Sequence, residues 1–515
     1  MSIIRTQDLT KRFDNFVANN KINIAVEKQE IKCIVGENGA GKTTLMNMLY
    51  GELKPSAGKI LIDEEEVKFT SPLEAIGYGI GMVHQHFMLV PSMTVYENIL
   101  LGIEISKKWF GRKIPVIDRQ EERRTVGDLI NRYGFQLDPG DRVENISVGM
   151  RQQVEILKML YRNVRILILD EPTSVLTPQE VDRLIVTLKT MRDAGKTIIV
   201  ITHKLREVMA LSDSVDVIKQ GNVVGRLKTS ETNERELAQL MVGRDVVLTV
   251  KNDSETMPGD DIVYRVKDLC TVNEYGKQIF KNISFEVHRG EILGIAGVEG
   301  NGQIELVKVL TGLMAATGGT VKITGTDITN AWPDELRKNR IGIIPEDRYA
   351  QGLCADMSIA ENCIAGHFNR EICIAGIFRK REIAKRCAAY IKKYDIRLAD
   401  VAGPVSQLSG GNAQKIIIAR EFESRPIMII ACQPTRGVDV GSIEFIHKEL
   451  LKFRNAGYSV LLVSSELSEI MSLSDRIAVM YKGEIVGEME AKNASVSEIG
   501  LLMAGTGNGK ERGHE

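Results

Sequence analysis

The sequence has no long hydrophobic run, no paired cysteines and almost no net charge. Its apolar runs, such as 165–169 and 426–431, are strand-length and fall well short of the roughly 20 residues of a membrane-spanning helix. The seven cysteines form no C-x-x-C pair, which favours a reducing compartment and argues against a zinc site. A net charge of -1 argues against nucleic acid as the main partner. The first residues lack the basic segment and apolar core of a secretion signal, so we expect none.

An internal repeat indicates how the chain divides, because 515 residues are too many for one hydrophobic core. Ile34–Gly41 reappears as Ile295–Gly302, an offset of 261 residues, and later stretches repeat at nearly the same offset. A period of this length indicates a duplicated domain and not a solenoid. We therefore predict two α/β domains with largely parallel sheets at 1–245 and 261–504, a polar linker at 246–260 and a disordered tail at 505–515.

The stretch Gly36–Thr44 fits the pattern G-x-x-x-x-G-K-[ST]. It lies between an apolar run at 31–35, predicted to be a strand, and a helix predicted to begin at Thr43. Glycines allow backbone N–H groups to surround a phosphate chain, and the helix N-terminus adds partial positive charge. Lys42 is suited to reach the β- and γ-phosphates, and the Thr43 hydroxyl to bind Mg²⁺. The sequence thus predicts a nucleotide-binding P-loop made of Gly36, Glu37, Asn38, Gly39, Ala40, Gly41, Lys42, Thr43 and Thr44.

Polar side chains follow three further predicted strands of the first copy. The run 165–169 ends in Asp170 and Glu171, which are suited to hold Mg²⁺ and to polarise the attacking water, respectively. His203 follows a second run and suits a γ-phosphate contact, while Gln85 follows a third and suits both metal and water. Taken singly, each has a plain alternative: a solvated turn, a structural histidine or a surface glutamine. Their positions downstream of the P-loop favour the catalytic interpretation.

The start of another predicted helix, at Ser147–Gly149, also suits phosphate binding through free N–H groups, although it is weak evidence alone. The P-loop, Gln85, Ser147–Gly149, Asp170–Glu171 and His203 come in the order found in ABC ATPases, and the chain resembles that family twice over nearly its whole length. A fused pair with an altered second copy resembles the ATP-binding subunits of bacterial sugar and nucleoside importers. The resemblance implies tandem ABC ATPase domains that use ATP and Mg²⁺, each with a helical subdomain, at about 87–163 and 347–424. It also implies an adenine-stacking aromatic, for which Phe13 is the candidate and Phe16 is nearly as well placed, with a core position as the alternative for either.

The second copy departs from the motifs at almost every chemical position. Gln303 and Ile304 replace the P-loop lysine and threonine, and Cys432 and Gln433 replace the two strand-end acids. The remaining replacements put Glu346 at the position of Gln85 and Ser465 at that of His203. Such a loop can hold a nucleotide by its glycines, but we predict that it does not hydrolyse one.

The second copy nevertheless keeps the better phosphate-binding signature, Leu408-Ser409-Gly410-Gly411-Asn412. In the family each ATP lies between the P-loop of one copy and the signature of the other. The resemblance therefore assigns Ser409, Gly410 and Gly411 to the nucleotide bound at Lys42. The altered P-loop would face Ile146–Met150, where Val148 replaces the first glycine.

The resemblance also implies partners and a location. A motor subunit of this type works with two integral-membrane permease subunits at the cytoplasmic face of the membrane, and only indirectly with an extracytoplasmic solute-binding protein or lipoprotein. The chain would contact the membrane only through the permeases, which would dock at the loop Phe87–Pro91 and at its counterpart in the second copy near Glu346–Arg348. No nucleic acid partner is expected. The stretches Met82–Pro91 and Gly297–Gln303 resemble the nucleoside branch more than the monosaccharide branch, which remains the alternative solute class.

Two other functions compete with transport. A soluble tandem ABC factor acting on ribosomes or nucleic acid usually carries a long charged helical insertion and two intact ATP sites, whereas this chain has a short linker and one altered site. A small-molecule kinase would need a motif for a second substrate and would not explain the duplication. We therefore predict an ATPase coupled to solute import.

Overall fold

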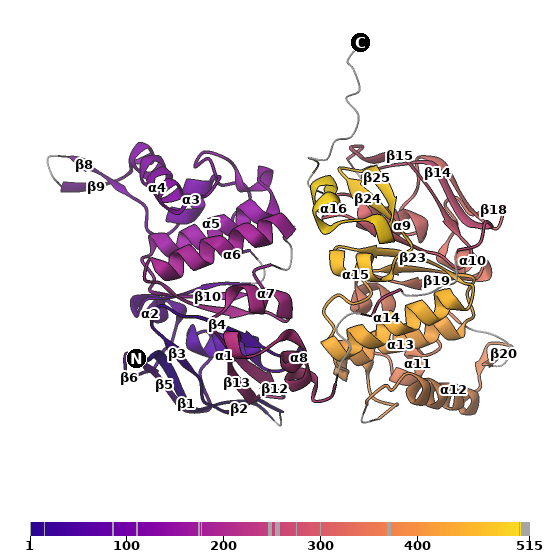
Figure 1. Cartoon of the computed structure of the whole chain (residues 1–515), viewed down its shortest axis with the longest axis horizontal. Helices are drawn as coiled ribbons and strands as arrows, with labels where there is room; N and C mark the ends of the chain where they lie inside the picture. Colours follow the sequence, from indigo (N-terminus) through magenta and orange to yellow (C-terminus); the bar gives the residue numbers. More distant parts are fainter. Residues whose placement is uncertain are drawn as a thin grey trace, which may run out of the picture. The chain divides into compact units, whose positions relative to one another are not determined.

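The computed structural model describes residues 2–14, 16–84, 87–109, 112–173, 176, 178–245, 250–252, 258–273, 275–298, 300–367, 372–398, 400–503 and 505. The chain forms two compact units, Met1–Asp245 and Val246–Glu515 (Figure 1). Gln85, most of the predicted linker 246–260 and all of the predicted tail except Gly505 lie outside the described residues. Within the predicted linker, Asn252 is bound to the second unit, because its N–H donates to the carbonyl oxygen of Ser472 over 2.8 Å.

A six-stranded sheet forms the centre of the first unit. Its order is β13–β12–β4–β11–β10–β7, and every neighbouring pair is parallel except β12 and β13. Every residue of β4, β10 and β11 is buried, as expected for near-continuous Ile, Leu and Val runs covered on both faces. Asp170 and Ile34 both pair with Ile201, so the three strands end level at one edge of the sheet. The strands are β4 (Ile31–Val35), β7 (Ile80–Val83), β10 (Ile166–Asp170), β11 (Thr197–Ile201), β12 (Ser214–Lys219) and β13 (Asn222–Lys228).

A second, antiparallel sheet of the first unit was absent from the sequence prediction. Its order is β2–β1–β5–β6, with β3 also paired to β1. Its buried residues, such as Ile4, Leu9 and Ile22, form one cluster with α1 (Lys42–Leu49) and with side chains of the central sheet. The strands are β1 (Ser2–Phe13), β2 (Phe16–Ile22), β3 (Ala25–Glu27), β5 (Ala57–Ile62) and β6 (Glu65–Val67).

The region 87–163, predicted to be helical, contains three helices and also an antiparallel hairpin that the prediction lacked. The hairpin, β8 (Ser106–Trp109) and β9 (Arg112–Ile117), extends away from these helices (Figure 1). The three helices are α3 (Val95–Leu100), α4 (Arg119–Tyr133) and α5 (Val148–Tyr161), with the short η1 (Val143–Asn145) before α5. The first unit also contains α2 (Pro72–Gly77), α6 (Pro178–Asp193), α7 (Leu205–Leu211), η2 (Thr229–Glu231) and α8 (Glu234–Val242).

The second unit repeats this architecture, except that its antiparallel sheet has four strands where that of the first unit has five. Its main sheet has the order β19–β22–β23–β16–β24–β25, again parallel except at the last pair, and its antiparallel sheet has the order β15–β14–β17–β18. The prediction of two tandem α/β P-loop domains with mainly parallel cores is therefore confirmed, with the antiparallel sheets as an addition. The strands are β14 (Ile262–Val272), β15 (Gln278–His288), β16 (Ile292–Ala296), β17 (Gly318–Ile323), β18 (Thr326–Asp327), β19 (Ile341–Ile344), β22 (Met428–Cys432), β23 (Ser459–Ser464), β24 (Arg476–Tyr481) and β25 (Glu484–Glu490).

The helices of the second unit also follow the order of the first. In the region 347–424, a hairpin of β20 (Cys373–Ile374) and β21 (Ile377–Phe378) again interrupts the helices. Across the described ranges of both units, no helix has the length and apolar character needed to cross a membrane. The helices are α9 (Gln303–Leu310), α10 (Pro333–Lys338), η3 (Arg348–Gly352), α11 (Ile359–Asn362), α12 (Lys380–Lys393), η4 (Val405–Gln407), α13 (Gly410–Glu423), α14 (Val440–Asn455), α15 (Leu467–Leu473), η5 (Ala491–Asn493) and α16 (Val496–Met503).

Candidate functional site

The P-loop of the first unit joins the end of β4 to the start of α1, and two of its glycines lie too close to other backbone for a side chain. A Cβ atom at Gly36 would lie 2.2 Å from the carbonyl oxygen of Ile218. At Gly41, which caps α1 with a φ of 98°, a Cβ atom would lie 2.3 Å from the carbonyl oxygen of Ala18. The loop is therefore held against the neighbouring strands with its N–H groups at the helix start, the arrangement that phosphate binding needs.

Lys42 lies inside this loop and is only 6% exposed. Its ammonium donates to the carbonyl oxygens of Gly36 and Glu37, over 2.7 and 2.9 Å. Burial lowers the pKa of Lys42, while nearby carboxylates, first Glu171 and then Asp170, oppose that shift. Because these two hydrogen bonds go to neutral carbonyl groups, an anionic phosphate can replace them with a stronger interaction.

Thr43 and Asp170 meet at the level edge of the central sheet. The Thr43 hydroxyl donates to Asp170 Oδ2 over 3.2 Å, and Asp170 is the last residue of β10. Burial raises the pKa of Asp170 and outweighs the opposing effect of this hydrogen bond. A hydroxyl and a carboxylate oxygen next to a phosphate-binding loop are hard ligands of the kind that Mg²⁺ prefers.

Glu171 and His203 form a second pair at the same edge. His203 Nδ1 lies 2.9 Å from Glu171 Oε1, and a proton on that nitrogen would be donated to the carboxylate. Glu171 has a φ of 46°, in the left-handed region that is strained for a residue with a side chain. Burial raises the pKa of Glu171, but the hydrogen bond and charge of His203 outweigh it, so the pKa lies below its ordinary value. The carboxylate is thus held ionised and oriented.

The structure brings together five of the predicted catalytic and metal-binding residues, namely Lys42, Thr43, Asp170, Glu171 and His203. The sixth, Gln85, lies outside the described residues. Phe13 and Phe16 face each other across β1 and β2 and are 44% and 61% exposed, and the Lys11 ammonium lies over the Phe13 ring, 5.0 Å from its centroid.

Asn19 is a supporting residue that the sequence analysis missed. It is fully buried in β2, and its Nδ2 donates to the carbonyl oxygen of Gly41 over 3.0 Å. Asn19 therefore fixes the P-loop where α1 begins. A lone asparagine in a strand carries no motif, and the only available signal was that the repeat places the apolar Phe280 at the aligned position.

The second unit has the same backbone at the corresponding edge but lacks the charges. Gln433 has a φ of 47°, and its Oε1 accepts hydrogen bonds from the N–H and hydroxyl of Ser465 over 3.3 and 3.2 Å. Cys432 takes the place of the metal-binding carboxylate, and burial raises the pKa of its thiol to about 12. Gln303 is 6% exposed and packs closely on Gly297. A Cβ atom placed at Gly297 would lie 1.9 Å from the side-chain amide nitrogen of Gln303. These neutral groups lack the lysine charge and the two carboxylates that hydrolysis requires.

The two signature segments begin helices in the same way. Ser147 caps α5 by accepting from the N–H of Met150, and Ser409 caps α13 by accepting from the N–H of Asn412, over 3.2 and 3.4 Å. The glycines that follow are closely packed within their own units. A Cβ at Gly411 would lie 2.3 Å from Ser442 Oγ and 2.5 Å from Asp439 Oδ2, and one at Gly149 would lie 2.4 Å from Glu180 Oε1. Substitution of either glycine by aspartate would therefore disturb its own unit whatever it does to ATP, and the two serines offer the cleaner comparison.

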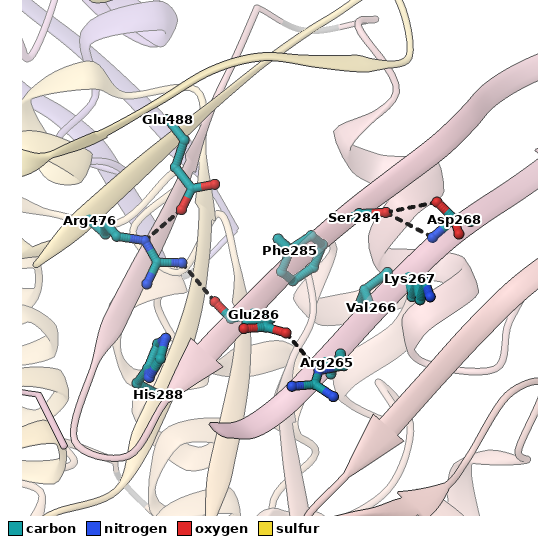
Figure 2. A pocket seen from close by; sticks show the side chains of 10 residues that line it. All are labelled: Arg265, Val266, Lys267, Asp268, Ser284, Phe285, Glu286, His288, Arg476 and Glu488. Atoms are coloured by element: carbon teal, nitrogen blue, oxygen red, sulfur yellow. Dashed lines mark hydrogen bonds and ion pairs between the residues drawn. The ribbon is translucent and has the colours of Figure 1, made fainter. Parts of the chain in front are cut away.

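An open, charged hollow on the second unit is distinct from these motifs (Figure 2). Arg265 pairs with Glu286, and Arg476 pairs with Glu488, both over 2.6 Å. Arg476 also donates to the carbonyl oxygen of Glu286 over 2.8 Å. These bonds connect β14 and β15 of the antiparallel sheet to β24 and β25 of the main sheet, which is a structural role.

Comparisons with known proteins agree with the repeat. Residues 19–174 and residues 280–436 each match the family described as ABC transporter. Over 98% of both chains, the sequence is 45% identical to a guanosine import ATP-binding protein of Bacillus subtilis and 43% identical to a nucleoside import ATP-binding protein of Lactococcus lactis. It is 41% identical to a glucose import ATP-binding protein of Haloferax volcanii, over 98% of this chain and 96% of that one.

Proposed function

This chain belongs to the ABC transporter family, as an import ATPase, and on that premise we propose that its first unit is the single hydrolysing centre of a nucleoside importer. The observation that carries the proposal is the contrast between the two sheet edges. Lys42, Thr43, Asp170, Glu171 and His203 converge in the first unit, while neutral side chains stand at the aligned positions of the second.

ATP would be held at the first P-loop, by the backbone of Gly36–Thr44 and the ammonium of Lys42. Thr43 and Asp170 would hold Mg²⁺, which neutralises charge on the phosphates when it is bound. Gln85 is assigned to the same metal and to the attacking water from sequence alone. Either Phe13 or Phe16 would stack on the adenine.

Glu171 would accept the proton of the attacking water. Its pKa lies below the ordinary value, so the carboxylate is ionised and ready at neutral pH. His203 would orient it and contact the γ-phosphate. Since His203 is bound through Nδ1, its Nε2 is left for that contact.

Ser409, Gly410 and Gly411 would complete the site when ATP is bound, through the N–H groups at the start of α13. The chain would work with two permease subunits at the cytoplasmic face of the membrane. An extracytoplasmic binding protein or lipoprotein would deliver the solute to the permeases without contacting this chain. The loop after Gln85 is the candidate docking surface, and its Met88 is 62% exposed.

Nucleosides are preferred over monosaccharides because the two relatives that import them are 43–45% identical to this chain and because Met82–Pro91 resembles that branch. Uptake of labelled guanosine, glucose and ribose by cells with and without the gene tests the assignment. We expect guanosine uptake to fall to background in the deletion strain and sugar uptake to persist. Loss of sugar uptake with guanosine uptake intact would move the chain to the monosaccharide branch.

A further inference from the structure

In the second unit, three separate segments are tied together around Arg348. Arg348 Nη1 donates to the carbonyl oxygen of Gly410 over 2.8 Å, and its Nη2 donates to the carbonyl oxygen of Arg436. The side chain of Arg436 in turn forms an ion pair with Glu346. We call Glu346, Arg348, Gly410 and Arg436 the Arg348 clasp. It links the segment after β19, the segment after β22 and the first residue of α13.

The clasp is one end of a longer attachment between η3 and α13. Arg348 is the first residue of η3, and Asp347 caps this turn by accepting from the N–H groups of Tyr349 and Ala350, over 2.9 Å each. At the other end of η3, the buried Arg420 of α13 donates to the carbonyl oxygen of Gly352 over 3.0 Å. The turn is therefore bound to α13 at both of its ends.

Gly410 is the residue that lets the guanidinium approach. A Cβ at this position would lie 3.0 Å from Arg348 Nη1 and 3.0 Å from the carbonyl oxygen of Gly437. A larger residue would force the arginine or this carbonyl to shift. The glycine thus serves the clasp, in addition to its proposed role at the phosphate.

The first unit cannot form this clasp. The repeat aligns Glu346, Arg348, Gly410 and Arg436 with Gln85, Phe87, Val148 and Ser174, respectively, which include no guanidinium group. In the first unit the loop after β7 is instead attached to the middle of α5. The N–H of Met88 donates to Glu155 over 2.6 Å, and Lys158 donates to the carbonyl oxygen of Met88 over 3.2 Å.

We propose that Arg348 is a positioning residue, which holds the signature Ser409–Gly411 in place without any nucleotide in the second unit. In the first unit the aligned segment carries Gln85, which is assigned to the metal and the water, and the loop after it is attached to the middle of α5. In the second unit the Glu346–Arg436 ion pair and the Arg348 guanidinium attach the aligned segment to the first residue of α13 and to the segment after β22 through protein contacts alone. The N–H groups at the start of α13 are then preorganised for the ATP held at Lys42, which favours hydrolysis because no reorganisation is needed in the transition state. This inference rests on the proposed role of Ser409–Gly411.

The test uses the full chain assembled with its permeases, with Arg348→Ala as the variant and Arg340→Ala as its matched control. Arg340 lies in the same unit and also donates two hydrogen bonds to a backbone carbonyl, that of Arg425, which follows the C-terminal end of α13. We expect Arg348→Ala to lower kcat for ATP about tenfold while the KM for ATP changes less than about twofold. Arg340→Ala should change both by less than about twofold.

A second readout does not depend on hydrolysis. Amide hydrogen exchange in the nucleotide-free full chain should become at least about tenfold faster at residues 410–412 in Arg348→Ala and stay unchanged there in Arg340→Ala. Arg348→Lys should recover part of kcat, because an ammonium can donate to the same carbonyls without the planar fork. Reversing the ion pair, with Glu346→Arg and Arg436→Glu together, should give a higher kcat than either substitution gives alone.

The outcomes separate this inference from the proposed function. If Lys42→Ala hydrolyses ATP at the wild-type rate, the proposed function fails and the clasp loses its purpose. If Lys42→Ala is inactive but Arg348→Ala matches Arg340→Ala in kcat and in exchange at 410–412, only the clasp is overturned. A rise in KM with kcat unchanged would also overturn it, since that result would give Arg348 a role in binding and not in positioning.

Discussion

The turns after β10 and β22 have the same backbone conformation at their first residue, but that residue carries a carboxylate in the first unit and a neutral amide in the second. Glu171 and Gln433 have φ values of 46° and 47°, and each is bound by the residue just past the next strand, His203 in one unit and Ser465 in the other. The strained conformation therefore persists where no carboxylate remains to use it. The buried parallel strands impose the shape of the turn, and the side chains placed on it decide whether the unit can hydrolyse ATP.

The largest effect should come from the P-loop lysine. Lys42→Ala should abolish ATP hydrolysis by the assembled transporter, because no other lysine stands at the aligned position of the second unit. The matched change Gln303→Ala should leave the rate within about twofold, since a neutral amide contributes no charge to the phosphates. Steady-state phosphate release measures both, and comparable losses in the two variants would break the contrast between the units.

The second-largest effect should come from Glu171, the carboxylate at the strained turn after β10. Glu171→Gln should still bind ATP but hydrolyse it about 10²–10⁴-fold more slowly, because it removes the proton acceptor and leaves the metal ligands. The reciprocal change Gln433→Glu should produce no gain, since Cys432 still replaces the metal ligand. Binding of a fluorescent ATP analogue and phosphate release give the two numbers, and near-normal hydrolysis by Glu171→Gln would contradict the assignment.

His203 should control the acid side of the pH–rate profile. After burial, which raises the pKa of Glu171, the largest influences on it are the hydrogen bond and charge of His203, which lower it, so the pKa should be higher in His203→Ala than in the wild type. The carboxylate would then be protonated at a higher pH, and kcat should fall off at higher pH on the acid side than in the wild type. At neutral pH we expect about a 10²-fold loss. An unshifted acid limb would show that the pair in the structure does not set the ionisation of the base.

Substitutions at the two capping serines, Ser147 and Ser409, should distinguish a loss of helix stability from a loss of catalysis. Ser147→Ala and Ser409→Ala should each destabilise their own helix by about 1 kcal/mol, because each removes a serine N-cap. Ser409→Ala also removes the bond that Ser409 accepts from Asn412 Nδ2. Only Ser409→Ala should slow hydrolysis, by about tenfold, since its signature is assigned to the active P-loop. Thermal unfolding checks the match in stability. Equal losses of activity would mean that the signature of the first unit is used as well.

The smallest effect, a change in the KM for ATP, should show which of Phe13 and Phe16 stacks on the adenine. Loss of the stacking residue should raise the KM for ATP by about 2- to 10-fold with little change in kcat, as expected for about 0.5–1.5 kcal/mol of ring interaction. Phe13→Ala and Phe16→Ala measured side by side identify the residue. If neither variant raises KM, both rings are merely surface residues of the hairpin.

Much of the fold and site could be predicted because the informative residues are local. Continuous apolar runs predict the buried strands that end at Val35 and Asp170, and the P-loop pattern predicts the turn and helix that follow β4. The antiparallel sheets were missed because their strands mix buried and exposed residues without regular alternation, as β1 and β2 do, so they show neither a continuous apolar run nor a period of two. Asn19 and the Arg348 clasp were missed for a different reason. Their hydrogen bonds reach carbonyl groups 22 to 88 positions away, which no local pattern encodes.

The central claim is that one of the two units hydrolyses ATP, and the most direct measurement is the amount of ADP formed per chain in a single turnover. Assembled transporter would be loaded with labelled ATP, freed of excess nucleotide and allowed to react once with Mg²⁺. We expect about one ADP per chain for the wild type and for Gln303→Ala, and none for Lys42→Ala. Two ADP per chain in the wild type, or one remaining in Lys42→Ala, would contradict hydrolysis by the first unit alone.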